Sequence, residues 1–221
     1  MIRDSALVTR LALVALAIAV GRDALAQNPP LPPTAPVVQP AAQPQRGGGG
    51  RGGIRVMTLT SSAFTDGGMI PAKHAQPGRD VSPPLAWTGA PDSTVSFVLI
   101  VHDADAAAGN GTDDMLHWMA WNIQGTTTSL PEGIPHGAQF PGGMRQISVS
   151  GPYYRGPAAP STGPAHHYVF ELYALDANIS VQPVGQTAAA TRAAVLEAIR
   201  GHVRGKGVLV GLFRRSEPPQ P

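Results

Sequence analysis

The amino-acid sequence predicts an all-β fold with a minor α-helical part, namely an antiparallel β-sandwich that carries one C-terminal helix. Three observations support this prediction. Several short runs are apolar and rich in β-branched residues, as strands are. Glycine and proline, 26 and 23 of the 221 residues, separate these runs as turns do. A single segment near the C-terminus has apolar residues at helical spacing, and many short strands with one late helix are typical of this architecture.

The strands follow one another in a regular order along the chain. The first covers Arg55–Ser61, and Ser82–Trp87 is extended because residues that precede proline avoid helical geometry. The run Val95–Val101 is almost wholly apolar and β-branched, which is typical of a strand buried on both faces. The remaining strands are His117–Ile123, His166–Leu175 and Lys206–Phe213. We therefore expect these six segments to form the two sheets.

The helix is predicted over Thr187–Val203. This segment is alanine-rich and places Val195, Leu196, Ile199 and Val203 at helix-like spacing, and Gly205 follows as a stop signal.

Residues 1–26 are predicted to be a secretory signal peptide. Arg3 and Arg10 precede the apolar run Leu11–Val20, and the small residues Ala24–Ala26 end it. That run is shorter than the roughly 20 residues that span a bilayer, so cleavage after Ala26 is favoured over an uncleaved anchor. The mature protein is then expected to be periplasmic or secreted.

The rest of the chain divides into a linker, one domain and a tail. Residues 27–53 are rich in proline and then in glycine, and they are predicted to be a disordered linker because nothing in them can form a core. The domain is predicted to span residues 54–216, with a disordered tail at 217–221.

Charge and cysteine content exclude several classes of function. Without residues 1–26, which hold three arginines and two aspartates, the formal charge falls from +2 to +1. Such a protein lacks the strongly basic face that nucleic acids require. The chain has no cysteine, which excludes disulfides and thiol catalysis.

The segment Phe97–Ile123 carries the first chemically interesting residues. It is interpreted as two apolar strands joined by a thirteen-residue polar loop, Ala104–Leu116. Asp103 ends the first strand and His117 begins the second, so an antiparallel pair brings them to the same edge of the sheet. A long loop without a helix of its own is often functional. The hairpin therefore predicts a carboxylate–imidazole site.

The two-residue period of strands sorts the side chains by face. In the first hairpin strand, Asp103 shares a face with the apolar residues before it. In the second, His117, Met119, Trp121 and Ile123 are expected to share one face. In the later strand, one face holds His166, Tyr168, Phe170 and Leu172, and the other holds His167, Val169, Glu171 and Tyr173. Polar groups that converge at the end of an apolar face are typical of a binding site.

A loop rich in glycine and proline, Gly151–Ala165, leads directly into His166. Such a loop is either a rigid surface loop or the wall of a pocket. In the second interpretation, which we favour, glycine permits close backbone approach to a ligand and exposes N–H donors.

Several of these motifs, in this order, resemble those of the phosphatidylethanolamine-binding protein family, particularly its bacterial Raf-kinase-inhibitor-like branch. The matching pieces are Ser61–Pro71, Asp80–Pro91, Asp103–Asp105, His117–Ile123 and His166–Asp176, within residues 57–213. The resemblance implies an antiparallel β-sandwich with a small anion pocket. It also implies which residues bind the ligand: Asp103, Asp105, His117, Gly156, Pro157, Pro160, His166 and Tyr168.

The sequence departs from the family pattern in the acidic motif Asp-Pro-Asp-x-Pro. Both acids are kept as Asp103 and Asp105, but alanines stand at 104 and 107 in place of the prolines. The family often has a cis proline at the second position, and a cis bond before Ala107 would cost about 2.5–4 kcal/mol. We therefore expect a trans bond and a more mobile loop.

The sequence thus favours a non-enzymatic binding protein for a small anion or a phospholipid head group of the phosphoethanolamine type, with no cofactor. The phosphate would meet His117, Tyr168 and backbone N–H groups, and Asp103 or Asp105 would meet the ammonium. An envelope or extracellular protein is a further partner, and a homodimer is left open.

Two alternatives remain at this stage. One is a metal-assisted hydrolase that uses the His/Asp cluster, although no standard metal or nucleophile motif is present. The other is an interaction protein that inhibits a protease or a kinase, as the family does in other settings.

Overall fold

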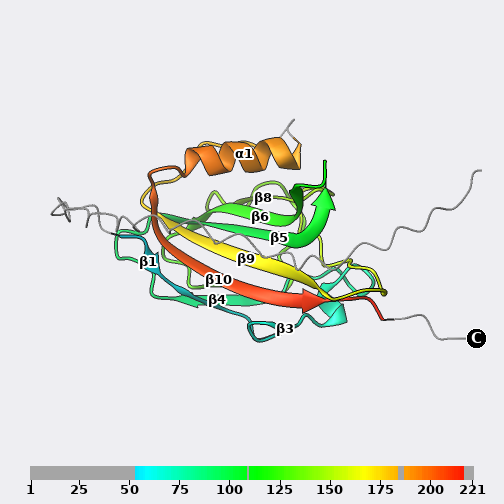
Figure 1. Cartoon of the computed structure of the whole chain (residues 1–221). Helices are drawn as coiled ribbons and strands as arrows, with labels where there is room; N and C mark the ends of the chain where they lie inside the picture. Colours follow the sequence, from blue (N-terminus) through cyan, green and yellow to red (C-terminus); the bar gives the residue numbers. More distant parts are fainter. Residues whose placement is uncertain (1–52, 109, 184–186, 217–221) are drawn as a thin grey trace, which may run out of the picture. The chain divides into compact units, whose positions relative to one another are not determined.

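The computed structural model describes residues 53–108, 110–183 and 187–216. The predicted signal peptide, the linker up to residue 52 and the tail 217–221 lie outside the described residues. Within them, the chain forms three layers, with a helix on one side of a large sheet and a small sheet on its other side (Figure 1). None of the described helices is long and apolar enough to cross a membrane.

The large sheet has seven strands in the order β1-β10-β9-β5-β6-β8, and β3 also pairs with β10. Their bounds are β1 Arg55–Val56, β3 Gly68–Met69, β5 Ser96–Ala108, β6 Asp113–Gln124, β8 Arg145–Ile147, β9 His166–Leu175 and β10 Val203–Phe213. The pairing is antiparallel except where β1 and β3 run parallel to β10. The sheet thus confirms the predicted all-β class and adds two short parallel contacts at one edge.

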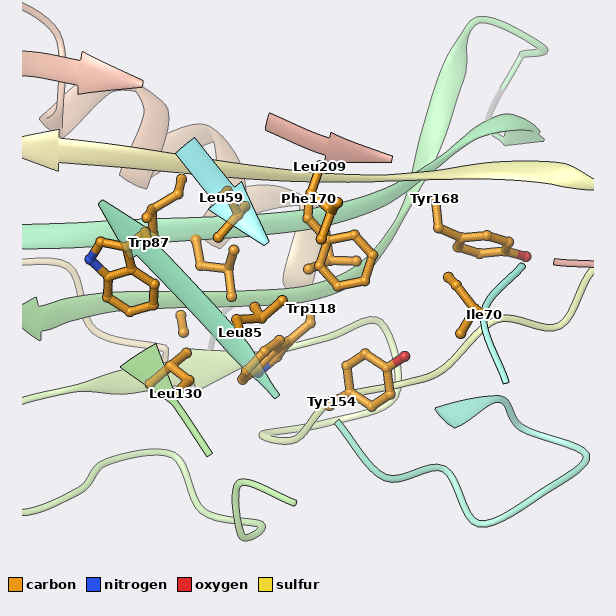
Figure 2. Close-up of a cluster of buried hydrophobic side chains, with 14 of the residues drawn as sticks. Leu59, Ile70, Leu85, Trp87, Trp118, Leu130, Tyr154, Tyr168, Phe170 and Leu209 are labelled. Carbon is orange, nitrogen blue, oxygen red and sulfur yellow. The ribbon is translucent and has the colours of Figure 1, made fainter. Parts of the chain in front are cut away.

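The small sheet consists of β2 (Thr58–Thr60), β4 (Leu85–Thr88) and β7 (Ser129–Leu130), and a 3₁₀ turn, η1 (Ala72–His74), follows β3. Apolar side chains from both sheets meet in what we call the inner core (Figure 2). It includes Leu59, Trp87, Phe97, Trp118, Tyr168, Phe170 and Leu209. The predicted faces of β9 are confirmed, because Tyr168, Phe170 and Leu172 all belong to this core.

Helix α1 (Ala188–Ala198) covers the opposite face of the large sheet. Val195 and Ile199 pack there with residues of β5 and β6 in what we call the outer core, which also includes Val98, Ile100, Leu116, Met119, Trp121 and Ile147. The predicted helix was too long at its C-terminal end. Gly201 has a φ of 82°, which turns the chain, and Val203 already pairs with Leu175 as the first residue of β10.

Strand β6 does not keep the strict alternation predicted for it. Its pairing with β5 shifts register beside His117 and again near Asn122, whose φ is 54°. Each β-bulge inserts an extra residue and reverses the alternation that follows. Met119 and Trp121 therefore pack in the outer core, whereas Ile123 packs in the inner core. The prediction that these three share one face with His117 was wrong.

The predicted polar loop between Ala104 and Leu116 is mostly strand. β5 continues to Ala108 and β6 begins at Asp113, so the hairpin arms extend well beyond Asp103 and His117. The register passes from Asp103 opposite Met115 to Ala108 opposite Asp113. Residues 104–107 therefore bulge out of β5, and polar composition alone concealed the strand. The peptide bond before Ala107 is trans, as expected.

Candidate functional site

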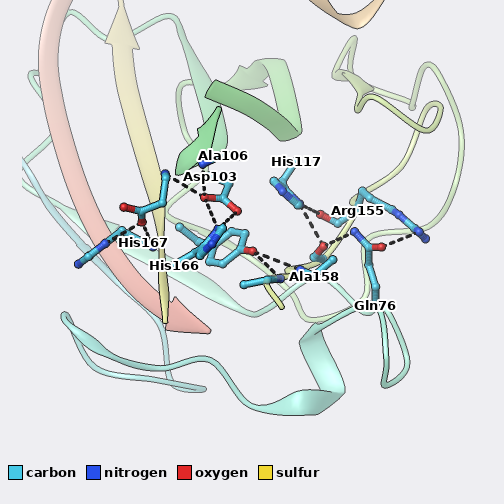
Figure 3. A network of polar contacts seen from close by, with 12 residues as sticks. Gln76, Asp103, Ala106, His117, Arg155, Ala158, His166 and His167 are labelled. Carbon is cyan, nitrogen blue, oxygen red and sulfur yellow. Dashed lines mark hydrogen bonds and ion pairs between the residues drawn. The ribbon is translucent and has the colours of Figure 1, made fainter. Parts of the chain in front are cut away.

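Four predicted site residues converge at one end of the inner face of the large sheet. Asp103 from β5 lies opposite Tyr168 of β9 in the strand register, and His117 of β6 and His166 of β9 lie beside them (Figure 3). Asp103, His117 and Tyr168 are almost fully buried, with exposed fractions of 4%, 2% and 1%. The sheet thus delivers two imidazoles, a phenol and a carboxylate from three strands to one place.

Asp103 and His166 are in direct contact within this cluster. His166 Nδ1 lies 2.9 Å from one carboxylate oxygen of Asp103 and 3.1 Å from the other. Asp103 Oδ1 also accepts hydrogen bonds from the backbone N–H groups of Asp105, at 3.0 Å, and Ala106, at 3.1 Å. These contacts compensate the cost of burying the carboxylate. They also tie down the bulged residues, although the two prolines of the family motif are missing.

His117 is oriented by the loop Gly151–Ala165, which we call the wall loop. Its Nδ1 lies 2.8 Å from the carbonyl oxygen of Arg155 and 3.0 Å from that of Gly156. A carbonyl oxygen only accepts, so Nδ1 must carry the proton. Burial lowers the pKa of His117, while these two carbonyls and the Asp103 carboxylate partly offset that effect. His117 is therefore neutral at pH 7, with Nε2 as its hydrogen-bond acceptor.

Tyr168 packs against His117 with the two rings nearly perpendicular and their centroids 5.0 Å apart. Its hydroxyl oxygen accepts hydrogen bonds from the backbone N–H groups of Ala158 and Ala159, both at 3.2 Å. Burial raises the pKa of Tyr168 well above its usual range, and Asp103 adds to this. The phenol therefore keeps its proton, and its oxygen accepts hydrogen bonds from the two N–H groups.

The predicted wall loop is present, but glycine serves a different purpose in it than expected. Gly156 and Pro157 are buried, whereas Pro160 is exposed. A Cβ on Gly156 would lie 2.3 Å from the carbonyl oxygen of His74, so the close approach that glycine permits here is to another part of this chain. The N–H donors near the cluster belong to the alanines at 158 and 159, where the family pattern was imperfect.

The structure does not bring Asp105 into the cluster. Its carboxylate accepts a hydrogen bond from the backbone N–H of His167 at 2.6 Å and lies 2.8 Å from His167 Nδ1. Both side chains are substantially exposed, by 43% and 55%. His167 belongs to the outer face of β9, opposite His166, and the bulge after Asp103 turns Asp105 towards it. Hydrogen bonds with His167 lower the pKa of Asp105 despite some opposing desolvation.

Two residues that hold the wall loop, Gln76 and Asp80, were not among the predicted site residues. Asp80 accepts hydrogen bonds from the backbone N–H of Gly156 and from the guanidinium of Arg155, and Gln76 binds the same two residues. Asp80 opens the motif Asp80–Pro91 on which the family resemblance partly depends, so the motif was a usable signal. The contact between Asp80 and the wall loop, about 75 residues later, could not be predicted from the sequence.

The two histidines of the cluster use their ring nitrogens in the same way. Each histidine uses Nδ1 within the protein, and no described residue is hydrogen bonded to Nε2 of either ring. In the part of the chain that the structure describes, no three His, Asp or Glu side chains are grouped so that they could hold a metal ion. The two Nε2 atoms are therefore the ring nitrogens that have no hydrogen-bond partner among the described residues.

Comparisons with known proteins agree with this fold. The family model described as phosphatidylethanolamine-binding protein matches residues 60–214. A UPF0098 protein of Methanothermobacter thermautotrophicus is 40% identical over 161 residues, which is 72% of this chain and 99% of the relative. A second UPF0098 protein, from Pyrococcus horikoshii, is 38% identical over 169 residues, or 74% of this chain and 80% of the relative.

Two solved structures are also similar. A phosphatidylethanolamine-binding protein homolog from Chlamydia trachomatis has 31% identity and a TM-score of 0.60, and the match covers 73% of this chain and 99% of that one. YbcL of E. coli, described as a member of the mammalian PEBP family, has 24% identity and a TM-score of 0.61, with 72% and 99% covered. At that identity the second likeness concerns the fold alone.

Proposed function

The chain belongs to the phosphatidylethanolamine-binding protein family, and on that premise we propose that Asp103, His117, His166 and Tyr168 bind a small anion such as the phosphate of a phospholipid head group. Family membership supports a binding-protein role. The observation that carries the proposal is the orientation of the two histidines. Each imidazole has Nδ1 fixed by this chain, so each offers Nε2 to a ligand. The proposed role is non-enzymatic.

The contacts favour recognition of the phosphate over recognition of the ammonium. Asp103 is 4% exposed and already faces His166 Nδ1 and two backbone N–H groups. Asp105, the other carboxylate expected to meet an ammonium, is paired with His167 instead. An anion would accept charge-assisted hydrogen bonds from Nε2 of His166 and of His117 when binding leaves each ring with two protons, and a further hydrogen bond from the Tyr168 hydroxyl. An ammonium finds no free carboxylate among these four residues.

Calorimetric titration with inorganic phosphate and with phosphoethanolamine tests the proposal. We expect saturable binding of both, with affinities within about fivefold of each other, because roughly 1 kcal/mol or less would come from the ammonium. His166→Ala should weaken both by about tenfold or more, since it removes a charge-assisted hydrogen bond. The matched control is His202→Ala, because His202 is also paired with an aspartate, Asp176, but at the other end of β9.

The result against the proposal is absence of saturable heat with either ligand, or equal affinities for wild type and His166→Ala. A strong preference for phosphoethanolamine would retain an anion site but contradict the assignment of Asp103. An envelope or extracellular location and a protein partner there remain part of the proposal, on the predicted signal peptide alone.

A further inference from the structure

Asp80 holds the wall loop at the peptide group that joins Arg155 and Gly156. Asp80 Oδ1 accepts a hydrogen bond from the backbone N–H of Gly156 at 2.5 Å. The carbonyl of Arg155, which belongs to the same peptide group, accepts a hydrogen bond from His117 Nδ1 at 2.8 Å. The N–H and C=O of a trans peptide point in opposite directions. One rigid plane therefore joins Asp80 directly to His117.

Further contacts prevent this peptide from rotating. Asp80 Oδ2 accepts from the Arg155 guanidinium at 2.9 Å, and the same guanidinium donates to Gln76 Oε1 at 2.7 Å. Gln76 Nε2 donates to the carbonyl oxygen of Gly156 at 2.8 Å, and the backbone N–H of Gln76 donates to the carbonyl oxygen of Pro157 at 2.9 Å. The loop is thus held by the side chains of Asp80 and Gln76, which lie 75 to 80 residues earlier, and Figure 3 shows the contacts of Gln76.

The backbone of Asp80 is itself unusual. Its φ is 57°, in the left-handed region that glycine, asparagine and aspartate tolerate better than other residues. Such a conformation costs free energy and persists when surrounding contacts impose it. Here it places the carboxylate between Gly156 and Arg155, where both oxygens are used.

We propose that Asp80 is a positioning residue of the anion site. It orients the Arg155–Gly156 peptide so that His117 keeps its proton on Nδ1 and Nε2 is the nitrogen that takes up a second proton when the anion binds. The part of this inference that concerns ligand affinity rests on the proposed function, whereas the part that concerns the proton of His117 does not.

The direct test is ¹⁵N NMR of the His117 ring in ligand-free protein, which distinguishes the two neutral tautomers. Wild type should show the Nδ1–H form. Asp80→Gly relieves the backbone strain but removes the carboxylate, and we expect a mixture of tautomers. Asp80→Asn keeps an acceptor for the Gly156 N–H and tolerates the backbone, so it should retain the wild-type tautomer.

Phosphate titration supplies the second readout. We expect Asp80→Gly to weaken phosphate binding by about tenfold, as loss of one hydrogen bond to a charged group does, and Asp80→Asn to weaken it less. The control is Asp176→Asn, which removes the charge of a partly exposed aspartate paired with His202 and Arg204. If Asp80→Gly does not fold, Asp80→Glu replaces it, since it keeps the charge but displaces the carboxylate by one methylene.

The outcomes separate the two proposals. A wild-type tautomer in Asp80→Gly, or in Asp80→Glu if that variant is used, overturns the positioning role whether or not phosphate binds. Absence of phosphate binding by wild type overturns the proposed function, and the tautomer measurement still decides the role of Asp80.

Discussion

Replacing Tyr168 by phenylalanine tests whether the phenol is a built part of the site. The ring and its burial are unchanged, so the perturbation is confined to the hydroxyl group. Its oxygen accepts hydrogen bonds from the backbone N–H groups of Ala158 and Ala159. In the variant, two amide groups that are partly or fully buried lose their partner.

The expected cost follows from those two hydrogen bonds. An unsatisfied buried donor costs about 1–3 kcal/mol. Both bonds measure 3.2 Å, which is the long end of the range for N–H···O, so the lower value applies to each. We therefore expect the free energy of unfolding to fall by about 2 kcal/mol in Tyr168→Phe.

Urea unfolding followed by tryptophan fluorescence measures this change, because Trp87, Trp118 and Trp121 are all buried. Two other tyrosines provide matched controls. Tyr154 donates one hydrogen bond, to the carbonyl of His74 at 2.8 Å, and its phenylalanine variant should lose about 1 kcal/mol. Tyr153 stacks on the His136 ring, and no described residue is hydrogen bonded to its hydroxyl, so Tyr153→Phe should lie within about 0.5 kcal/mol of wild type.

The reasoning is refuted if Tyr168→Phe unfolds at the same urea concentration as Tyr153→Phe. That result would mean that the two amides find other partners or that the wall loop is not held by the phenol. A loss equal to that of Tyr154→Phe would show that only one of the two N–H groups depends on Tyr168.

Two further predictions concern packing and acid stability. Gly156→Ala places a Cβ 2.3 Å from the His74 carbonyl oxygen, so urea unfolding should show that the free energy of unfolding falls by about 1–3 kcal/mol. Gly53→Ala is the control, because a Cβ there has nothing within 4 Å and the free energy of unfolding should not change. His102, and then Lys206, hold the pKa of Glu171 at about 2, below its ordinary 4.5, against the effect of burial. A lowered pKa contributes stability above pH 4.5 that is lost as the pH falls towards 2. Between pH 4.5 and pH 2, the free energy of unfolding of wild type should fall by about 3 kcal/mol more than that of Glu171→Gln. An equal fall in both proteins would contradict the lowered pKa of Glu171.

The parts of the fold that were predicted well are those in which local pattern and tertiary environment agree. Strand β9 has the predicted bounds, His166–Leu175, because one face meets the inner core along its whole length and keeps the period of two. The helix was placed correctly at its start, where the Thr187 side chain accepts from the N–H of Ala190, but not at its end. There, Gly201 and the pairing of Val203 with β9 decide the boundary.

The parts that were predicted poorly depend on partners far away in the sequence. The bulge beside His117 is a property of the pairing between β5 and β6, and no residue type in β6 announces it. The bulge after Asp103 sends Asp105 to His167, although a regular strand would have kept both aspartates on one face. Polar composition suggested a loop where the hairpin arms continue as strands.

The sequence by itself determined the β class and the family, and its list of candidate site residues includes the four in the cluster, because motifs and strand periodicity are local features of the chain. Tertiary structure decided which carboxylate belongs to the cluster, which ring nitrogen each histidine offers, and which residues hold the wall loop. These depend on the register between strands and on contacts such as that of Asp80 with Gly156. Register and long-range contacts arise from the packing of the whole domain, so no local stretch of the chain contains them.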